Sequence, residues 1–234
     1  MKVGIIIPAL RKKEITSLCV NSIYDNTDSK LFTLYLIDND STDNEPVADY
    51  FNDKFHNITY LVNMPPKNVT DSWNQGVEMA LKDKCDYILV MNNDIVVGKD
   101  WLKVLVQTLK DNPDIWMLSP DAIQKEFIDY DFDKLSIERL TMPNDIQDRP
   151  GRFCFICPSI TFKKIGLFDP NLHYFYGDDD YELRLRVAGK KGVYCRQVVI
   201  HHFESLTVNS RKKNDKKFRE RLRQDAKYFG KKWQ

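Results

Sequence analysis

The chain has 234 residues with a formal net charge of +1, and 42% of them are hydrophobic. A chain of this length and composition can bury a sizeable core, which indicates a globular protein. Its apolar runs are far too short to span a bilayer, and its first residues lack the apolar core and cleavage site of a signal peptide. We therefore expect a cytoplasmic protein with one main domain.

The charges are unevenly distributed. Residues 209–234 contain 11 Lys and Arg against 3 Asp and Glu, whereas residues 1–208 contain 24 against 31. This asymmetry predicts a slightly acidic domain over residues 1–208 and a basic helical extension over residues 209–234. Three interpretations of the extension stay open: a solvated helix, a contact with an anionic membrane surface at the inner face of the membrane, and a contact with nucleic acid.

Hydrophobic patterns predict alternating strands and helices in the first half of the chain. The expected strands are residues 2–8, 31–37, 57–62, 87–91 and 115–118, and the expected helices are residues 14–26, 46–51, 70–82 and 100–110. This alternation indicates an α/β fold with a mostly parallel central sheet flanked by helices. No G-x-G-x-x-G or Walker loop follows the first strand, which argues against a dinucleotide dehydrogenase or a P-loop enzyme.

Residues 120–150 interrupt the pattern and predict a long, irregular, acidic connection or an edge hairpin. The pattern then resumes, and the expected elements are a strand at 151–160, a helical turn at 159–165, a helix at 181–188, a strand at 192–200 and a basic helix at 210–229. Cys154 and Cys157 lie three positions apart in a predicted strand, so we expect buried thiols on opposite faces rather than a zinc site.

Polar clusters stand at the ends of predicted strands or at the start of a predicted helix. They comprise residues 38–43, 92–94, 178–180 and 201–202. Each cluster alone can be a turn or a helix cap. The carboxyl ends of parallel strands meet along one edge of a sheet, so together the clusters predict one site at that edge.

Two of the clusters suit a metal ion. Asp94 is a hard oxygen ligand of the kind that Mg²⁺ or Mn²⁺ takes in a diphosphate site. Asn92 would point the same way as Asp94 if the strand continued. His201 and His202 leave opposite faces of a strand end, so one of them can ligate the ion while the other packs.

The acidic cluster at residues 178–180 suits a general base. Acids at a helix N-terminus complement the helix dipole, which is the structural alternative. Three adjacent carboxylates repel one another, however, and the repulsion raises the pKa of at least one of them. The preceding Tyr174, Phe175 and Tyr176 can stack on a sugar ring or pack in the core.

The order of these motifs resembles that of the inverting family-2 glycosyltransferases, which have the GT-A fold. The matching segments are residues 3–10, 36–43, 68–76, 92–94, 165–189 and 198–202. Leu10 replaces the usual Asn of the first segment, and Gly177 replaces the usual Glu before the catalytic Asp. The resemblance implies a nucleotide-sugar-binding half at residues 1–118 and an acceptor and catalytic half at residues 119–208.

The resemblance also implies roles for individual residues. Asp94, with Asn92 and with His202 or His201, would hold Mn²⁺ or Mg²⁺ on the donor diphosphate, and Asp178 or Asp179 would deprotonate the acceptor hydroxyl. The residues implied to contact the nucleotide sugar are Pro8, Ala9, Leu10, Asp38, Asn39, Ser41, Asn68, Ser72, Trp73, Asn92 and Asn93, and those implied to contact the acceptor are Gly151, Arg152, Phe153 and Tyr176.

A UDP-sugar is the expected donor, with dTDP- and GDP-sugars as alternatives because Asn39 replaces an Asp found in many uridine-binding members. The acceptor can be a glycan, a lipid-linked sugar or a nucleic acid. A sugar nucleotidyltransferase fits less well, because residues 11–13 lack the glycine-rich loop that it needs. A non-catalytic sugar- or nucleic-acid-binding protein on the same scaffold is the alternative from another functional class.

Overall fold

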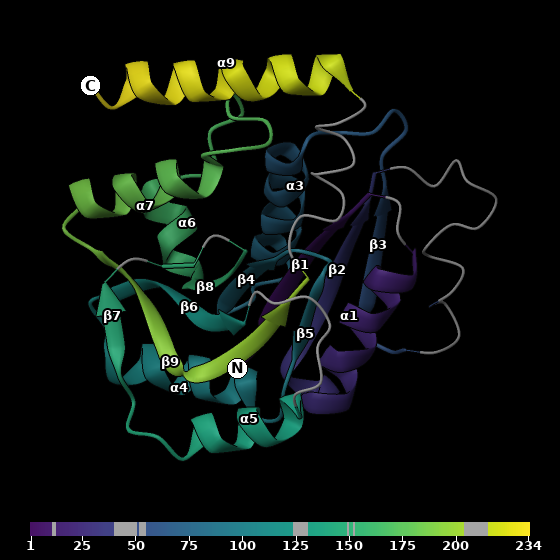
Figure 1. Ribbon diagram of the computed structural model, residues 1–234, viewed down its shortest axis with the longest axis vertical. Coiled ribbons are helices and arrows are strands. Elements are labelled where there is room, and N and C mark those ends of the chain that lie inside the picture. The colour runs from purple at the N-terminus through teal and green to yellow at the C-terminus, as the bar shows by residue number, and fades with distance from the viewer. Residues whose placement is uncertain are drawn as a thin grey trace.

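The apolar run that precedes Asn92 forms strand β4 (Tyr87–Met91) inside the central sheet of the computed structural model. The structure describes residues 1–10, 13–39, 51, 55–123, 131–148, 150–151, 153–203 and 215–234. Among these residues nine strands form one sheet in the order β3-β2-β1-β4-β8-β6-β9-β5, and β7 also pairs with β9. Figure 1 shows the sheet crossing the molecule with helices on both sides.

The first half of the sheet is parallel. Strand β4 pairs with β1 (Val3–Ala9), β1 pairs with β2 (Phe32–Asp38), and β2 pairs with β3 (Ile58–Val62). The carboxyl ends of these strands therefore lie along one edge, where open α/β sheets bind ligands. Asp38 ends β2 at this edge, and Asn92 follows β4 there.

The second half of the sheet is mixed. Strand β8 (Cys154–Pro158) is antiparallel to β4 and to β6 (Ile115–Ile123), whereas β6 is parallel to β9 (Lys191–His202). Two short strands, β5 (Ile95–Val97) and β7 (Ile146–Asp148), are antiparallel to β9. The structure thus confirms the predicted α/β class and adds antiparallel strands to the predicted sheet.

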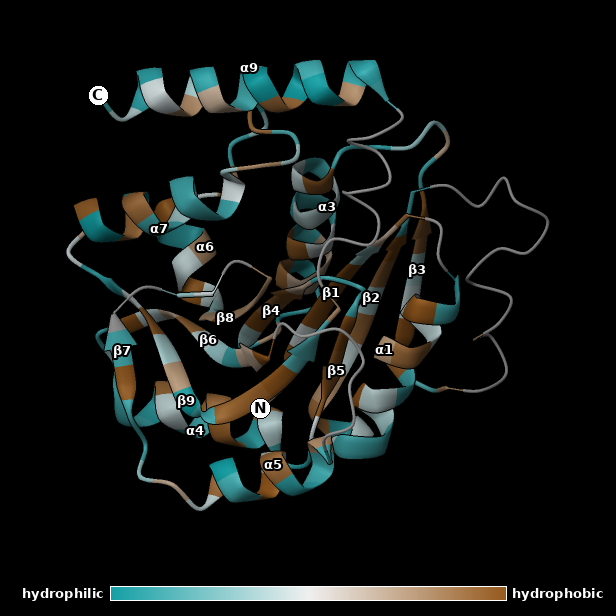
Figure 2. Ribbon diagram, in the orientation of Figure 1, coloured by the Kyte–Doolittle hydropathy of each residue, from teal (hydrophilic) through white to brown (hydrophobic). Residues whose placement is uncertain are grey.

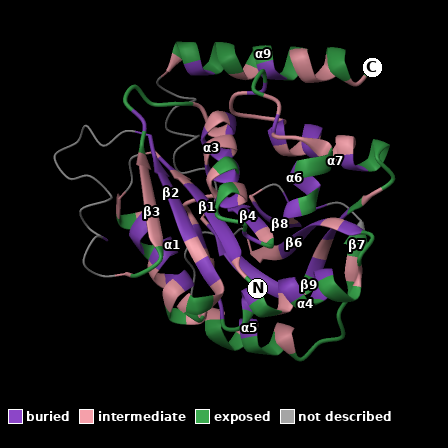
Figure 3. Cartoon of the chain, turned by 180° about the vertical axis from the view of Figure 1, so that it is seen from behind, coloured by how far each residue is buried: buried purple, intermediate pink, exposed green. Residues whose placement is uncertain are grey.

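Two hydrophobic clusters cover the two faces of the sheet. Helices α1 (Lys13–Asn26) and α4 (Trp101–Asp111) contribute to one cluster, and α3 (Val69–Lys82), α6 (Ser159–Ile165) and α7 (Gly177–Val187) contribute to the other. Figures 2 and 3 show the central strands as hydrophobic and buried. Burial on both faces explains why these strands have continuous apolar sequences.

Neighbouring side chains of one strand enter different clusters. In β1, Ile5 and Ile7 belong to one cluster and Ile6 to the other. In β8, Cys154 and Cys157 are divided in the same way and both are fully buried, as predicted. Burial raises the pKa of both thiols, so these cysteines behave as small core residues.

The first half of the chain follows the predicted boundaries closely. From β1 to α4, the predicted ends of each strand or helix whose ends are described differ from the observed ends by at most one residue. Asn68 caps α3 by accepting a hydrogen bond from the backbone N–H of Asp71 at 2.8 Å, which fixes the start of that helix. Of the helix predicted at 46–51, the structure describes Phe51 alone, which is helical and buried.

The prediction of an irregular connection over residues 120–150 is wrong for much of its length. Strand β6 continues to Ile123, and helix α5 (Phe132–Leu140) and strand β7 follow. The register between β6 and β9 shifts between Pro120 and Asp121, and a proline is tolerated at such an irregularity. Helix α5 has one buried residue, Ser136, so it lacks the hydrophobic stripe that predicts a helix. Residues 124–130 lie outside the described part of the chain.

Other boundaries also differ from the prediction: β8 spans Cys154–Pro158 rather than residues 151–160. The chain bends after β4 and then forms β5, a strand too short to recognise from its sequence. Helix α7 begins at Gly177 rather than Tyr181, so residues 178–180 form its first turn. The C-terminal helix α9 (Lys216–Lys232) begins after residues 204–214, which the structure does not describe.

None of the described helices is long and apolar enough to cross a membrane.

The packing of α3 against β1 depends on Gly76. A methyl group at this position would clash with the side chain of Ile6, which is fully buried in the strand. We therefore expect Gly76→Ala to reduce the free energy of unfolding by about 1–3 kcal/mol, the usual cost of overpacking. Urea denaturation monitored by circular dichroism measures this difference.

Gly230 in α9 is the matched control, because no heavy atom lies within 4 Å of a methyl group added there. Alanine is favoured over glycine by about 1 kcal/mol inside a helix, so Gly230→Ala should leave stability unchanged or raise it. Equal stability of Gly76→Ala and the parent protein would contradict the tight packing of α3 on β1.

Candidate active site

The pairing of β5 with β9 brings together two residues that lie far apart in the sequence. Ile95 is opposite His202 in this pairing, and Asp94 directly precedes Ile95. As a result His202 Nε2 lies 3.2 Å from Asp94 Oδ1, with only 10% and 15% of the two side chains exposed. The structure therefore places the predicted metal ligands Asp94 and His202 side by side.

Asp94 and His202 contact each other, but the polar atoms of this contact make no hydrogen bond with the described part of the protein. Asp94 Oδ1 and both ring nitrogens of His202 are buried and have no hydrogen-bond partner among the described residues. Buried polar atoms without partners are costly, and a coordinated cation removes this cost. The donor set of one carboxylate and one imidazole thus fits a divalent ion.

His201 has a different environment. Its ring lies 4.4 Å from the ring of Phe203 and 6.2 Å from that of Phe132 in α5, whereas the ring of His202 lies 4.8 Å from that of Phe153. Of the two histidines left open by the sequence, His202 faces Asp94 and His201 packs among aromatic rings.

Among the described residues there is no group of three or more His, Cys, Asp and Glu side chains that could hold a metal. A pair of protein ligands is nevertheless sufficient when substrate phosphates and water complete the coordination, as is usual for Mg²⁺. The pair of Asp94 and His202 therefore fits a metal held jointly by protein and diphosphate.

The sequence interpretation took Asn92 and Asp94 as part of a continuing strand. In the structure the strand ends at Met91 and the chain bends. The Asn92 N–H donates to the carbonyl of Phe153 at 2.9 Å. The Asn93 side chain donates to Thr16 Oγ1 in α1 at 2.8 Å. These contacts hold the bend that turns the chain from β4 into β5, so Asp94 is aimed at β9.

Asn39 is the centre of a buried polar network beyond β2. Its side-chain oxygen accepts hydrogen bonds from Asn63 Nδ2 at 2.9 Å, from Ser72 Oγ at 3.2 Å and from the Lys67 N–H at 3.3 Å. Its backbone N–H donates to the carbonyl of Ala9 at 2.9 Å. The network fixes the ends of β1 and β2 against the start of α3.

This network gathers several residues that the resemblance assigns to the nucleotide. Asp38 is 1% exposed at the end of β2, opposite Ala9 in the parallel register. Pro8 precedes Ala9, Leu10 follows it, and Asn68 caps the helix that carries Ser72. Ser41 lies outside the described residues. The contacts of these residues with a nucleotide stay a prediction.

Trp73 lies in the core rather than on an open surface. It is 6% exposed, and its ring is 5.1 Å from that of Phe168 and 6.4 Å from that of Phe155. Its indole N–H is buried without a hydrogen-bond partner among the described residues. The ring also approaches Gly177, where an added methyl group would lie 3.5 Å from Cζ3.

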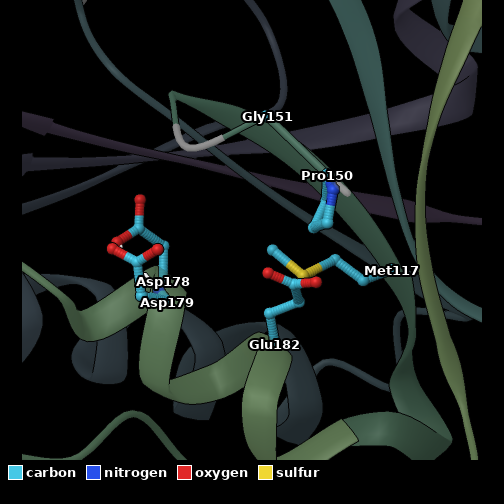
Figure 4. Close-up of a pocket in the computed structure, with 6 residues that line it drawn as sticks. All are labelled: Met117, Pro150, Gly151, Asp178, Asp179 and Glu182. Carbon is cyan, nitrogen blue, oxygen red and sulfur yellow. Dashed lines mark hydrogen bonds between the residues drawn. The ribbon is translucent and has the colours of Figure 1, made fainter. Parts of the chain in front are cut away.

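The candidate base residues face a small pocket at the start of α7. Figure 4 shows Asp178 and Asp179 in the first turn of the helix and Glu182 one turn further along it. The pocket is lined by Met117, Pro150, Gly151, Asp178, Asp179 and Glu182. The predicted acceptor residue Gly151 thus adjoins both candidate bases, whereas Arg152 lies outside the described residues.

Asp180, the third acid of the cluster, does not line the pocket. It is fully buried, and its carboxylate binds Arg184 Nε at 2.9 Å, Lys232 Nζ at 2.7 Å and Trp233 Nε1 at 2.9 Å. Two cations therefore balance its charge, which weakens the argument that three carboxylates repel one another. The geometry limits the candidate bases to Asp178 and Asp179.

The segment around Phe153 lies between the acidic pocket and the metal pair. The Phe153 ring contacts His202, its carbonyl accepts from Asn92, and Gly151 lines the pocket two residues earlier. Tyr176, also assigned to the acceptor, stacks its ring on Phe229 of α9 at 4.8 Å, so the packing alternative holds for this ring.

Sequence reasoning missed two groups of residues around the pocket. Glu182 follows Asp178 by four positions, a spacing that places both side chains on the same helix face and could have identified it. Lys232 and Trp233 contact Asp180 although Trp233 lies 53 positions further along the chain, and no local pattern indicates such contacts.

A family model described as glycosyl transferase family 2 matches residues 4–169. No curated protein matches the chain. A crystal structure of GalNAc-T7 with UDP, GalNAc and Mn²⁺ has a similar fold, with a TM-score of 0.70 and 14% identity over 88% of this chain. The chain spans 44% of that protein. Since the family match covers most of the chain and the fold agrees, the protein belongs to glycosyl transferase family 2 and has the GT-A fold.

Proposed function

We propose that the protein transfers a sugar from a nucleoside-diphosphate sugar to an acceptor hydroxyl, with a divalent ion and with inversion at the anomeric carbon. A UDP-sugar is the first candidate donor. The observation that carries the proposal is the buried pair of Asp94 and His202, which lie 3.2 Å apart and whose Asp94 Oδ1 and His202 ring nitrogens make no hydrogen bond among the described residues. The GalNAc-T7 structure, with its UDP and Mn²⁺, supports this ligand class for the fold.

The metal end of the site serves the leaving group. Asp94 and His202 would hold Mn²⁺ or Mg²⁺ between the end of β4 and the end of β9. A divalent ion in this position stabilises the charge that develops on the departing nucleoside diphosphate. The network around Asn39 keeps Asp38 and the ends of β1 and β2 fixed, which provides a rigid place for the nucleoside.

The carboxylates at the start of α7 would serve the acceptor. Asp178 or Asp179 takes the proton of the acceptor hydroxyl while its oxygen forms a bond to the anomeric carbon. The bond from that carbon to the donor phosphate oxygen breaks on the opposite side, so the configuration inverts. Asp180 is held by Arg184 and Lys232 and takes no part in the proton transfer.

The outer face of α9 supports an anionic surface as a partner near the acceptor. Besides Lys232, the helix carries seven exposed cationic residues against one exposed acid, Glu220; they are Lys216, Lys217, Arg219, Arg221, Arg223, Lys227 and Lys231. Phe218, Tyr228, Phe229 and Trp233 contact the body of the protein. Single-stranded nucleic acid binding uses exposed aromatic rings, so these contacts favour a membrane surface over a nucleic acid.

The metal pair is tested with Asp94→Ala and His202→Ala. Mn²⁺ together with the donor nucleotide should raise the melting temperature of the parent protein by several degrees, because ligand at about 100 times its Kd adds about 2.7 kcal/mol of stability. Both variants should lose this shift and at least about 10- to 100-fold of transfer activity. Thermal unfolding of the parent protein and both variants with UDP-, GDP- and dTDP-sugars, with and without Mn²⁺, measures the shift in melting temperature.

His201→Ala is the matched control, since His201 is as buried as its neighbour but does not face Asp94. Its metal-dependent shift should equal that of the parent protein. A parent protein that no nucleotide sugar stabilises, with or without Mn²⁺, would contradict the proposed function.

The base is tested with Asp178→Asn and Asp179→Asn. One of the two should lower transfer by about 10²- to 10⁴-fold, the usual contribution of general base catalysis, and leave donor binding intact. Glu182→Gln should have a smaller effect, because Glu182 lines the pocket but pairs with Arg186. If both Asp variants are as active as the parent protein, the general-base assignment fails and non-catalytic binding gains support.

The outer face of α9 is tested by charge reversal at Lys216 and Arg223, which are exposed on the side opposite Phe218 and Asp225. Each cation near an anionic membrane contributes about 1 kcal/mol, so the double variant should bind vesicles containing phosphatidylglycerol far more weakly than the parent protein. Sedimentation with anionic and neutral vesicles measures the difference. Tighter binding to single-stranded nucleic acid than to the vesicles would instead support a nucleic-acid partner.

A further inference from the structure

Helix α9 is attached to the protein through the segment that leads into the candidate base. Figure 1 shows it lying across the same end of the molecule as α7 and α3. Its two buried residues are Phe218 and Asp225, which are 4% and 1% exposed. Burying a carboxylate costs free energy unless it is hydrogen-bonded or paired with a cation, so the burial of Asp225 calls for a partner.

The Asp225 carboxylate binds the backbone of Tyr174 and Phe175 and the side chain of His173. Its Oδ2 atom accepts hydrogen bonds from the N–H groups of Tyr174 at 2.9 Å and Phe175 at 3.2 Å, and its Oδ1 atom lies 3.3 Å from His173 Nδ1. Hydrogen bonds to an ionised acceptor are about twice as strong as neutral ones. Asp225 therefore fixes the path of the chain just before α7.

Aromatic contacts support the same segment. The Tyr174 ring meets the Phe218 ring edge to face at 4.9 Å, and the Tyr176 ring stacks on Phe229 at 4.8 Å. Tyr176 has φ = 67°, in the left-handed region that a non-glycine residue adopts only when its surroundings hold it there. The next residue begins α7, so this backbone turn decides where Asp178 and Asp179 point.

The far end of α9 binds acids on both sides of the segment. Lys232 Nζ lies 2.6 Å from Asp169 Oδ2 and 2.7 Å from Asp180 Oδ1. Burial alone would raise the pKa of Asp169, but the Lys232 ammonium and the hydrogen bonds from Asn171 and Tyr228 lower it to about 2. Residues 169–180 are thus held by α9 at both ends and in the middle.

We infer that α9 positions the general base, and that Asp225 is its main positioning residue. The inference rests on the proposed function. None of the residues that line the acidic pocket belongs to α9, so the helix acts through the backbone before Asp178 rather than on the substrate. Its basic outer face and its positioning inner face are separate features of one element.

The test compares Asp225→Ala and Asp225→Asn with Glu220→Ala, an exposed acid on the outer face of the same helix. Asp225→Ala should reduce kcat by about 100-fold, the effect of displacing a catalytic group by about 1 Å. The KM for the donor and the Kd for the nucleotide should not change. Asp225→Asn retains an oxygen acceptor of the same size and should recover much of kcat, and Glu220→Ala should match the parent protein.

Hydrogen exchange at the amides of Tyr174 and Phe175 provides a readout that does not depend on activity. Both amides should lose protection in Asp225→Ala and keep it in Glu220→Ala. Unchanged protection or an unchanged kcat would overturn the inference, as would an equal loss of nucleotide binding and kcat, which indicates general unfolding. A parent protein that transfers no sugar refutes the proposed function instead, while the exchange data still decide whether Asp225 holds the segment.

If Asp225→Ala fails to fold, Lys232→Met replaces it. This variant removes the ammonium between Asp169 and Asp180 and keeps the apolar stem of the side chain. It should lower kcat with the donor KM unchanged and increase exchange at the start of α7. Parent-like kcat and exchange in this variant would overturn the inference.

Discussion

The antiparallel pairing of three residues in β5 with the end of β9 is the constraint on which the site depends. Asp94 and His202 are separated by more than a hundred positions, and this register alone puts them 3.2 Å apart. The hydrogen bonds of Asn92 and Asn93 hold the bend that makes the register reachable. The buried strand β4 precedes the bend, so the core, the bend and the candidate metal ligands form one continuous structure.

Asp178, Asp179 and Asp180 are adjacent in the sequence, but the residues that surround each of them give them different environments. Asp178 and Asp179 line a pocket, whereas Asp180 is turned into the protein and bound by Arg184 and Lys232. The repulsion expected among three acids is relieved by neutralising one of them. This arrangement leaves two carboxylates, those of Asp178 and Asp179, at the pocket beside the helix N-terminus.

The predictable features are those written in local patterns. Strand β4 matches its prediction because burial on both faces leaves a continuous apolar run, and the GT-A fold follows from the motif order. Strand β5 is three residues long, and α5 buries only Ser136, so neither carries a pattern. The choice of His202 over His201 required the register of β9, which no count of residues along the chain supplies.

The uneven charge noted in the sequence has a structural explanation in two parts. The inner face of α9 carries Lys232, which neutralises Asp169 and Asp180 of the otherwise acidic domain, so part of the basic charge is used within the fold. The outer cations are exposed along the whole helix. A charge run that appears uniform in sequence therefore divides by helical face: one side contacts the segment before Asp178, and the other stays exposed, where we propose that it meets an anionic surface.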